Sequence, residues 1–313
     1  MDTFDIFVDS SANIPDELIT KFNISVIPYT CTVNGKERLC YEKDTAFSVT
    51  AKKYYDDLRA GADIKTSLVD KERIKAAVEP TLKAGRDALM LTISSGVSGT
   101  NAQANEARKE LEELYPNSKM YVFDSANAGL GEGLQALKVA DLRALGESAC
   151  SCYEWLKQNS YKFNSYFTVG DLKYLRRGGR ISATLAIAGT ILNIKPILKA
   201  DSGTVAKISF CGKERGRKKA IAALVRYFKE RAVNPESNTV AIAHADCEED
   251  ALELAAMLRE NGAKDIIIEY YDLCTGSHVG PGTIALFFYG KDRRTEYAAA
   301  EKASMAAPAT RKI

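Results

Sequence analysis

Short apolar runs alternate with longer amphipathic segments along the first half of this 313-residue chain, and no other feature limits the fold as strongly. The apolar runs predict strands at 4–11, 24–33, 87–93 and 119–125. The amphipathic segments predict helices at 14–22, 49–60, 71–85, 100–114 and 131–144. Strands that alternate with helices of about 10–15 residues indicate βαβ units. We therefore expect an α/β domain whose parallel sheet is covered by helices on both faces.

The second half of the chain has a different pattern. The segment 195–210 predicts a hairpin whose two strands join through Asp201-Ser202-Gly203. Helices are expected at 147–160 and 248–261, and strands at 239–245, 265–273 and 283–290. This pattern is typical of an α+β domain with a mixed or antiparallel sheet. We expect an N-terminal, Rossmann-like α/β domain at 1–160, a C-terminal α+β domain at 161–293 and an Ala-rich tail, helical or frayed, at 294–313.

Charge and composition argue against several classes of function. Lys plus Arg number 43 and Asp plus Glu number 41, so the net charge of +2 provides no field that would attract nucleic acid or an anionic membrane. Seven cysteines without a C-x-x-C pair, and only two histidines, argue against a zinc site and favour reduced thiols. The chain shows neither a basic leader nor a run of about 18 apolar residues. We expect a soluble, cytoplasmic protein without a metal or cofactor, for which peripheral or transient membrane contact stays open.

Small polar residues gather at Asp9-Ser10-Ser11, Thr66-Ser67, Ser94 to Thr100 and Asp124-Ser125, and three of these four groups clearly follow predicted strands. The carboxyl ends of parallel strands meet at one edge of a sheet, where ligands bind. For Asp9-Ser10-Ser11 and Asp124-Ser125, capping of a helix N-terminus is the simpler interpretation, because Asp and Ser accept hydrogen bonds from free helical N–H groups.

The loop from Ser94 to Thr100 is more specific. It contains Ser94, Ser95, Ser98, Gly99 and Thr100, and a helix is predicted to begin near Thr100. The free N–H groups of that helix and the flexible glycines favour a bound anion. The loop lacks the lysine of a phosphate-binding G-x-x-x-x-G-K-[ST] motif, and its spacing misses the G-x-S-x-G nucleophile elbow. A small oxyacid is therefore the favoured ligand, and a nucleotide is not.

Other candidates lie in the second half. His278 stands among glycines before an apolar strand, and we expect a tight turn that points its ring into a cleft. His244 lies at the end of a predicted strand, before a predicted helix, where local packing or capping is the favoured role. Gly178-Gly179 is expected to end a helix in the left-handed region. The apolar stretch 181–194 either lines a channel or fills a core, and the basic segment 213–220 is suited to an acidic partner surface.

Taken in order, these motifs resemble those of the DegV family over nearly the whole chain, to about residue 290. The matching stretches are D-S-S at 9–11, T-S at 66–67, ISSGVSGT at 93–100, FDSANAGLGEG at 123–133, LKYLRRGGRIS at 172–182, LNIKPIL at 192–198 and HVGPG at 278–282. The resemblance implies a two-domain α/β protein that holds one long-chain fatty acid in a tunnel between its domains. Characterised members of this type present the fatty acid to an ATP-dependent kinase, which phosphorylates its carboxylate for phospholipid synthesis.

The resemblance also implies roles for individual residues. Thr66, His278 and a serine of the loop would bind the carboxylate; Ser95 and Ser98 are favoured over Ser94. Arg180 resembles an arginine that supports this pocket, and Arg215 resembles a residue that docks the kinase. After Thr66-Ser67 the family usually has Gln-Pro-Ser, whereas this chain has Leu68-Val69-Asp70.

Two classes of function remain in competition at this point. The first is a carrier subunit that binds a fatty acid and catalyses nothing itself. The second is an acyl or phosphoryl transferase, or an esterase, in which Ser95 or Ser98 acts with His278. The absence of a Walker lysine, a nucleophile elbow and an acidic metal cluster favours the carrier.

Overall fold

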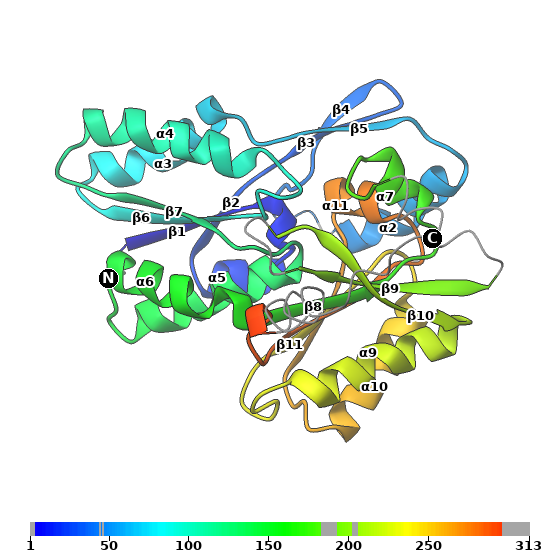
Figure 1. Cartoon of the computed structure of the whole chain (residues 1–313). Helices are drawn as coiled ribbons and strands as arrows, with labels where there is room; N and C mark the ends of the chain where they lie inside the picture. Colours follow the sequence, from blue (N-terminus) through cyan, green and yellow to red (C-terminus); the bar gives the residue numbers. More distant parts are fainter. Residues whose placement is uncertain (1–3, 44, 46, 183–192, 202–205, 296–313) are drawn as a thin grey trace, which may run out of the picture.

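A computed structural model describes residues 4–43, 45, 47–182, 193–201 and 206–295 (Figure 1). Its strands form a four-stranded sheet, a six-stranded sheet and a smaller three-stranded sheet. The α/β class, with an N-terminal parallel sheet and a C-terminal part rich in strands, is confirmed.

The four-stranded sheet is parallel throughout, in the order β2 (Ile24–Ile27), β1 (Phe4–Asp9), β6 (Asp87–Thr92) and β7 (Met120–Asp124). Its central strands are almost entirely buried, since helices cover both faces. Helices α3 (Lys71–Lys83) and α4 (Thr100–Leu114) lie on one face, and α5 (Leu130–Ala144) and α6 (Ala149–Asn159) on the other (Figure 1). A short 3-10 turn (Ser10–Ala12) and α1 (Asp16–Lys21) join β1 to β2.

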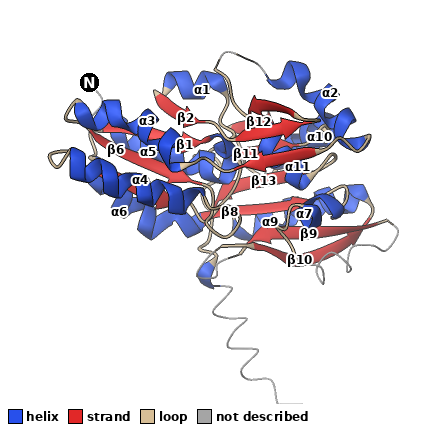
Figure 2. Ribbon diagram, turned by 90° about the horizontal axis from the view of Figure 1, so that it is seen from above, coloured by secondary structure: helices blue, strands red, loops and turns tan. Residues whose placement is uncertain are grey.

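The six-stranded sheet is mixed, and Figure 2 shows its strands in sequence from β12 to β10. In that order they are β12 (Ile266–Tyr270), β11 (Val240–His244), β13 (Ile284–Tyr289), β8 (Phe163–Thr168), β9 (Ile194–Ala200) and β10 (Ile208–Arg215). Only the β11–β12 pair is parallel. The expected hairpin is confirmed, because β9 and β10 pair antiparallel. Helices α9 (Arg217–Arg231) and α10 (Glu248–Glu260) cover the lower face in Figure 1.

Helix α5 joins the two large sheets, because it packs against β1 and β6 of one and β8, β11 and β13 of the other. Its first half is buried on every side, which is why that half is rich in small and apolar residues. Gly131 and Gly133 are needed there: a Cβ on Gly133 would lie 2.5 Å from the carbonyl oxygen of Ala12. The chain passes between the sheets after α6 ends at Asn159, and the domain limits at 160 and 161 stay a prediction.

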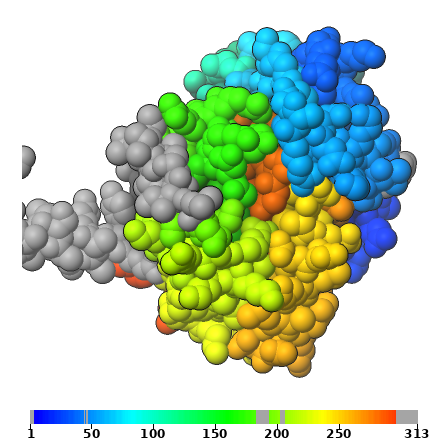
Figure 3. All heavy atoms as spheres, turned by 90° about the vertical axis from the view of Figure 1, so that its right-hand side faces the viewer, coloured from blue at the N-terminus to red at the C-terminus, as the bar shows by residue number. Residues whose placement is uncertain are grey.

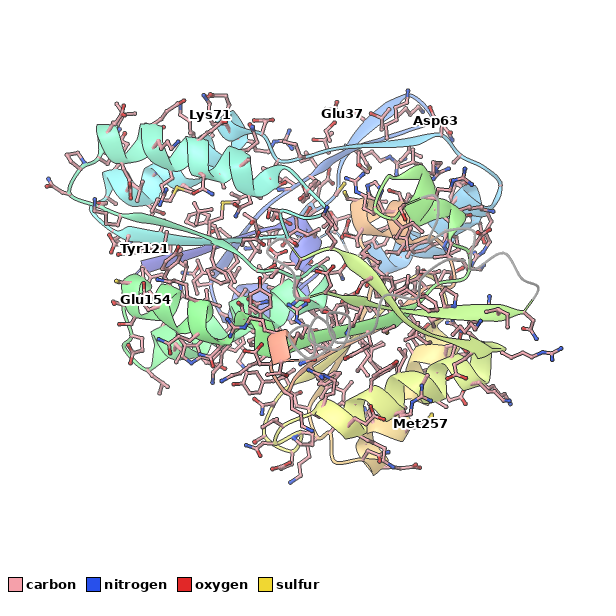
Figure 4. All side chains as sticks on the ribbon, viewed as in Figure 1. Glu37, Asp63, Lys71, Tyr121, Glu154 and Met257 are labelled. Carbon is pink, nitrogen blue, oxygen red and sulfur yellow. The ribbon has the colours of Figure 1, made fainter. Side chains whose placement is uncertain are left out.

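The three-stranded sheet was not anticipated. It consists of β4 (Lys36–Leu39), β3 (Thr30–Val33) and β5 (Ile64–Ser67), all antiparallel. The expected single strand at 24–33 is wrong, because β2 ends at Ile27 and β3 belongs to this other sheet. Strand β4 is exposed along its whole length, and Glu37 and Asp63 lie at the outer end of the sheet (Figure 4).

Two further helices lie beneath this sheet. Helix α2 (Phe47–Arg59) packs against β12, and the Tyr55 hydroxyl donates to the carbonyl oxygen of Tyr271 at 2.7 Å. Helix α11 (Leu273–Val279) replaces the tight turn expected around His278, and the strand predicted to reach residue 273 ends at Tyr270. The cause is Asp272, whose carboxylate accepts hydrogen bonds from the N–H groups of Cys274 and Thr275 and so begins the helix.

Some sequence predictions fall outside the described residues. They are nearly all of the Ala-rich tail at 294–313, most of the apolar stretch at 181–194 and the hairpin turn at Ser202-Gly203. Among the residues that are described, no helix is long and apolar enough to cross a membrane.

Candidate functional site

A cavity of about 230 Å³ lies where the Ser94–Thr100 loop, the three-stranded sheet and α11 meet. In the space-filling view α11, drawn in orange, is seen between the green residues around α7 (Lys173–Arg177) and the blue residues of the N-terminal part (Figure 3). Most of the wall is apolar, from Leu68, Ile93, Val97, Ala128, Leu175, Ile208 and Val279. The polar side chains of the wall are those of Ser11, Tyr29, Thr66, Ser98, Arg180, Thr275 and His278. We call this cavity the main pocket.

Thr66 and His278 meet at the wall of the main pocket. The Thr66 hydroxyl, on β5, and Nε2 of His278, on α11, lie 2.9 Å apart and form a hydrogen bond. Burial, together with the positive charges of Arg180 and Arg177, lowers the pKa of His278 to about 4. The imidazole is therefore neutral near pH 7, so it has one donor nitrogen and one acceptor nitrogen.

The glycine pair after α7, Gly178-Gly179, ends the helix and also leaves room for the His278 ring. Gly179 has a φ of +72° and ends α7 in the left-handed region, as expected. A Cβ on Gly178 would lie only 2.3 Å from Nδ1 of His278. The backbone of Gly178 thus packs directly against the imidazole, and no larger residue fits there without displacing it.

Three hydroxyl groups form a cluster at the start of α4. The Tyr29 hydroxyl lies 2.8 Å from Oγ1 of Thr100 and 3.1 Å from Oγ of Ser98, and these last two atoms are 3.0 Å apart. Gly99 is the N-cap residue of α4 and also lines the main pocket. The cluster fixes Ser98 at the wall of the main pocket. Sequence reasoning missed Tyr29, which follows Pro28 without a motif of its own.

Arg180 connects the loop to the end of α7. Its Nε donates to the carbonyl oxygen of Val97 at 3.1 Å, and its Nη1 donates to the carbonyl oxygen of Gly178. Val97 directly precedes Ser98 in the loop, and Gly178 packs against the His278 ring, so both acceptors lie next to groups of the pocket wall. The guanidinium therefore positions the loop against α11.

The other two loop serines lie outside the main pocket. The hydroxyl of Ser94 donates to the carbonyl oxygen of Ala206 at 2.6 Å, and the exposed Ser95 donates to Asp124 at 2.5 Å. Asp124 thus holds the loop instead of capping a helix. Ser94 faces a smaller cavity of about 70 Å³, whose wall also includes Phe167 and Phe287. This cavity adjoins the main pocket, because both are lined by Val97, Ala128, Ile208, Thr275 and Val279. The two cavities therefore lie side by side, and the surface of each is mostly apolar.

A polar cavity of about 340 Å³ lies on the other side of the Thr66–His278 pair. Lys65, Arg177 and Arg180 line it together with Asp63 and Ser277, and Thr66 and His278 belong to both cavities. A group bound at Thr66 and His278 would thus face an apolar pocket on one side and a polar, positively charged opening on the other.

Two buried acids, Asp9 and Glu132, contact Ser11 at the wall of the main pocket. Asp9 accepts hydrogen bonds from the N–H groups of Ser11 and Ile93, both at about the normal length, 3.0 and 2.9 Å. This confirms the capping interpretation of Asp9-Ser10-Ser11. Burial raises the pKa of Asp9 to about 6 and that of the fully buried Glu132 well above its ordinary value. The hydroxyl of Ser11, which lines the main pocket, lies between the two carboxyl groups.

Two candidates lie away from the main pocket. Arg215 is exposed at the end of β10, next to the start of α9. His244 is buried at the end of β11, and its Nδ1 accepts a hydrogen bond from the N–H of Cys247 at 3.4 Å, a local contact as expected. Among the described residues, no group of three or more His, Cys, Asp and Glu side chains is arranged to hold a metal ion.

Comparison with known proteins places this architecture in a family. A family model described as "Uncharacterised protein, DegV family" matches residues 3–291. The chain belongs to the DegV family. It is 39% identical over 292 residues to a DegV domain-containing protein of Clostridium perfringens, covering 93% of this chain and 98% of that one.

Solved structures of the family share the fold. A structure described as showing fatty acid binding of a DegV family protein from Thermus thermophilus is 25% identical, with a TM-score of 0.78 over 93% of this chain and all of that one. DegV from Bacillus subtilis, described as a fatty acid binding protein, is 26% identical, with a TM-score of 0.76 over 93% of this chain and all of that one.

Proposed function

We propose that this chain binds one long-chain fatty acid, with the carboxylate at Thr66, Ser98 and His278 and the acyl chain in the main pocket and the smaller apolar cavity beside it. The observation that carries the proposal is the Thr66–His278 pair, two neutral polar groups that bond to each other at the wall of a pocket whose surface is mostly apolar. The fatty acid binding that is named for two DegV structures with the same fold supports it.

The energetics agree with this ligand. A carboxylate in an apolar pocket is costly to desolvate unless hydrogen-bond donors meet it, and hydrogen bonds to a charged acceptor are the strong kind. At about 0.8 kcal/mol for each buried CH₂, a chain of about sixteen carbons contributes on the order of 10 kcal/mol before ordering costs. The acyl chain then supplies most of the affinity, and the polar groups fix its orientation.

A second proposal concerns what happens to the bound fatty acid. We infer that the chain is a cytoplasmic carrier that presents the carboxylate to an ATP-dependent fatty acid kinase for phospholipid synthesis, with catalysis in the partner and no cofactor of its own. The polar cavity beside Thr66 and His278 gives the partner's phosphate donor a route to the carboxylate. Arg215, exposed beside a basic helix start, is suited to docking an acidic partner surface.

The geometry favours this carrier over the esterase or transferase. The hydroxyl that contacts His278 belongs to Thr66, whereas Ser98 bonds to Tyr29 and Thr100, and Ser95 bonds to Asp124. A serine nucleophile needs a base within hydrogen-bond reach. A histidine whose pKa is lowered to about 4 is also a weak base near pH 7.

The decisive experiment is extraction and mass measurement of the lipid that copurifies with the full chain, followed by uptake of oleate or palmitate by the delipidated protein. We expect one fatty acid per chain. A protein that carries no lipid and takes up neither acid would refute the proposal. Hydrolysis of an acyl ester that disappears in Ser98→Ala would instead support the esterase.

A further inference from the structure

A separate cavity of about 250 Å³ lies where β1 and β12 end, and it shares no lining residue with the main pocket. Five carboxyl side chains belong to its wall: those of Asp9, Asp16, Glu17, Glu269 and Asp272. No Lys, Arg or His is among the described residues that line it. We call this cavity the acidic cavity.

Asn13 joins the two sides of the acidic cavity. Its φ of +58° lies in the left-handed region, which asparagine tolerates better than most residues. Its Nδ2 donates to the carbonyl oxygen of Tyr270 at 2.6 Å, and its Oδ1 accepts from the N–H of Asp272 at 2.9 Å. The loop after β1 is therefore fixed to the loop after β12, which belongs to the other large sheet. This contact brings acids from two distant parts of the chain to one cavity.

The negative charges of the acidic cavity lack a positive partner. Arg86 pairs with Asp5 near the other end of β1, whereas none of the five carboxylates forms an ion pair within the described part of the chain. Burial raises the pKa of Asp9 and of Asp272 to about 6, and the charge of Asp272 adds to the effect on Asp9. Both side chains are still mostly ionised near pH 7. Because buried charges are normally paired, a cation in the cavity would supply the missing partner.

Asp272 marks the inner end of the acidic cavity. Its side chain is 8% exposed, and its Oδ1 accepts hydrogen bonds from the N–H groups of Cys274 and Thr275 at 2.6 and 2.9 Å. Its Oδ2 is buried and has no hydrogen-bond partner among the residues described. A buried acceptor without a donor is costly, so a donor brought by a ligand would stabilise it.

The rest of the wall indicates the class of cation. Within the described ranges, these carboxylates are not arranged to hold a metal ion, which favours an organic cation. Asp272 is buried, whereas Glu269 is half-buried and Glu17 is exposed, so acids lie both deep in the cavity and near its mouth. Apolar side chains such as Ile14 and Phe47 also line the cavity and are suited to methylene groups. Two ammonium groups joined by methylenes match this combination.

We propose that the acidic cavity binds a linear aliphatic diamine, with one ammonium group at Oδ2 of Asp272 and the other among the outer carboxylates of Asp16, Glu17 and Glu269. Charge-assisted hydrogen bonds hold the two ends, and the methylenes pack on the apolar wall. The site is independent of the proposed fatty-acid function, because the two cavities share no residue.

The ligand class is tested by titration calorimetry of the full chain with three small molecules of equal carbon number. Putrescine has two ammonium groups, butylamine has one, and butanediol has two neutral hydroxyls. We expect one putrescine per chain. Butylamine should bind at least about tenfold more weakly, since it loses one charge-assisted contact, and butanediol should not bind. Absence of putrescine binding, or equal binding of butanediol, would overturn the proposal.

The position of the ligand is tested with variants that keep the side-chain shape. Asp272→Asn retains an oxygen that caps α11 and should weaken putrescine binding at least about tenfold. The double variant Asp16→Asn/Glu269→Gln should also weaken it, and it provides the test if Asp272→Asn does not fold. Glu253→Gln, exposed on α10, removes a charge far from the cavity and should leave putrescine affinity unchanged. Equal affinities in the cavity variants and in Glu253→Gln would overturn the assignment of this site.

Discussion

Replacement of Thr66 by valine tests the carboxylate site most directly, because valine keeps the shape of threonine and removes only its hydroxyl. The Oγ1 atom of Thr66 is 2.9 Å from Nε2 of His278 and belongs to the wall of the main pocket. In the proposed complex this hydroxyl donates to the carboxylate while His278 orients it. Thr66→Val therefore removes one charge-assisted hydrogen bond and leaves the buried imidazole nitrogen without its partner.

The expected loss of affinity follows from the free energy that such a hydrogen bond contributes. Hydrogen bonds to charged groups contribute about 1.5–3 kcal/mol, and each 1.4 kcal/mol is a factor of ten in affinity. Thr66→Val should thus weaken oleate binding about 10- to 100-fold, measured by displacement of a fluorescent fatty acid from delipidated protein. Binding of a long-chain alcohol, which lacks the carboxylate, should fall much less.

Ser67→Ala is the matched control for this variant. Ser67 is the next residue of β5, so its side chain leaves the opposite face of the sheet, and it is exposed. The control should bind oleate as the unmodified chain does. If Thr66→Val and Ser67→Ala bind oleate equally well, the carboxylate is not held at Thr66, and the assignment of this pocket fails.

Three further predictions follow from the contacts of His278, Gly96 and Arg215. Burial lowers the pKa of His278 from its ordinary value of 6.5 to about 4 in the folded chain. The contribution of His278 to the free energy of unfolding is therefore complete above pH 6.5 and is lost as the pH falls toward 4. Between pH 7 and pH 5, urea unfolding should show that the unmodified chain loses about 2 kcal/mol more of this free energy than His278→Gln does. Gly96→Ala would place a Cβ 2.1 Å from the carbonyl oxygen of Ala206. Thermal unfolding should show a destabilisation of at least about 1–3 kcal/mol. An unchanged unfolding midpoint would show that the loop from Ser94 to Thr100 is not held against Ala206. Arg215→Ala should slow phosphorylation of bound oleate by the kinase in a salt-dependent manner and leave oleate affinity unchanged, and equal kinase rates would remove Arg215 from the docking surface.

The parallel sheet and its helices could be predicted because burial on both faces gives each element a strong pattern. The helix expected at 100–114 is found at those residues, since a hydroxyl-rich loop precedes it and an apolar stripe runs along it. The hairpin of β9 and β10 was equally clear, because two runs of strand-forming residues flank a polar turn.

Strands β4 and β5 gave no comparable signal. Strand β4 has the sequence Lys36-Glu37-Arg38-Leu39 and is exposed throughout, so it has no alternation of apolar and polar residues. It is held by hydrogen bonds to β3 that depend on the whole fold. Helix α11 was missed for another reason: Leu273–Val279 contains glycine and β-branched residues, which disfavour helices, and the capping residue Asp272 was the only local indication.

Strand β5 and helix α11, neither of which was predicted, supply the central pair of the candidate site, Thr66 and His278. Sequence motifs located both residues but could not show that they form a hydrogen bond, because the contact depends on how an exposed sheet packs on a short helix. In the proposed complex, the same packing explains why the pocket needs no lysine. A neutral imidazole and hydroxyl groups bind a carboxylate only while the apolar surroundings exclude water, since water competes with such donors once it enters. In the proposed complex, separation of β5 from α11 would therefore admit water and weaken the hold on the carboxylate.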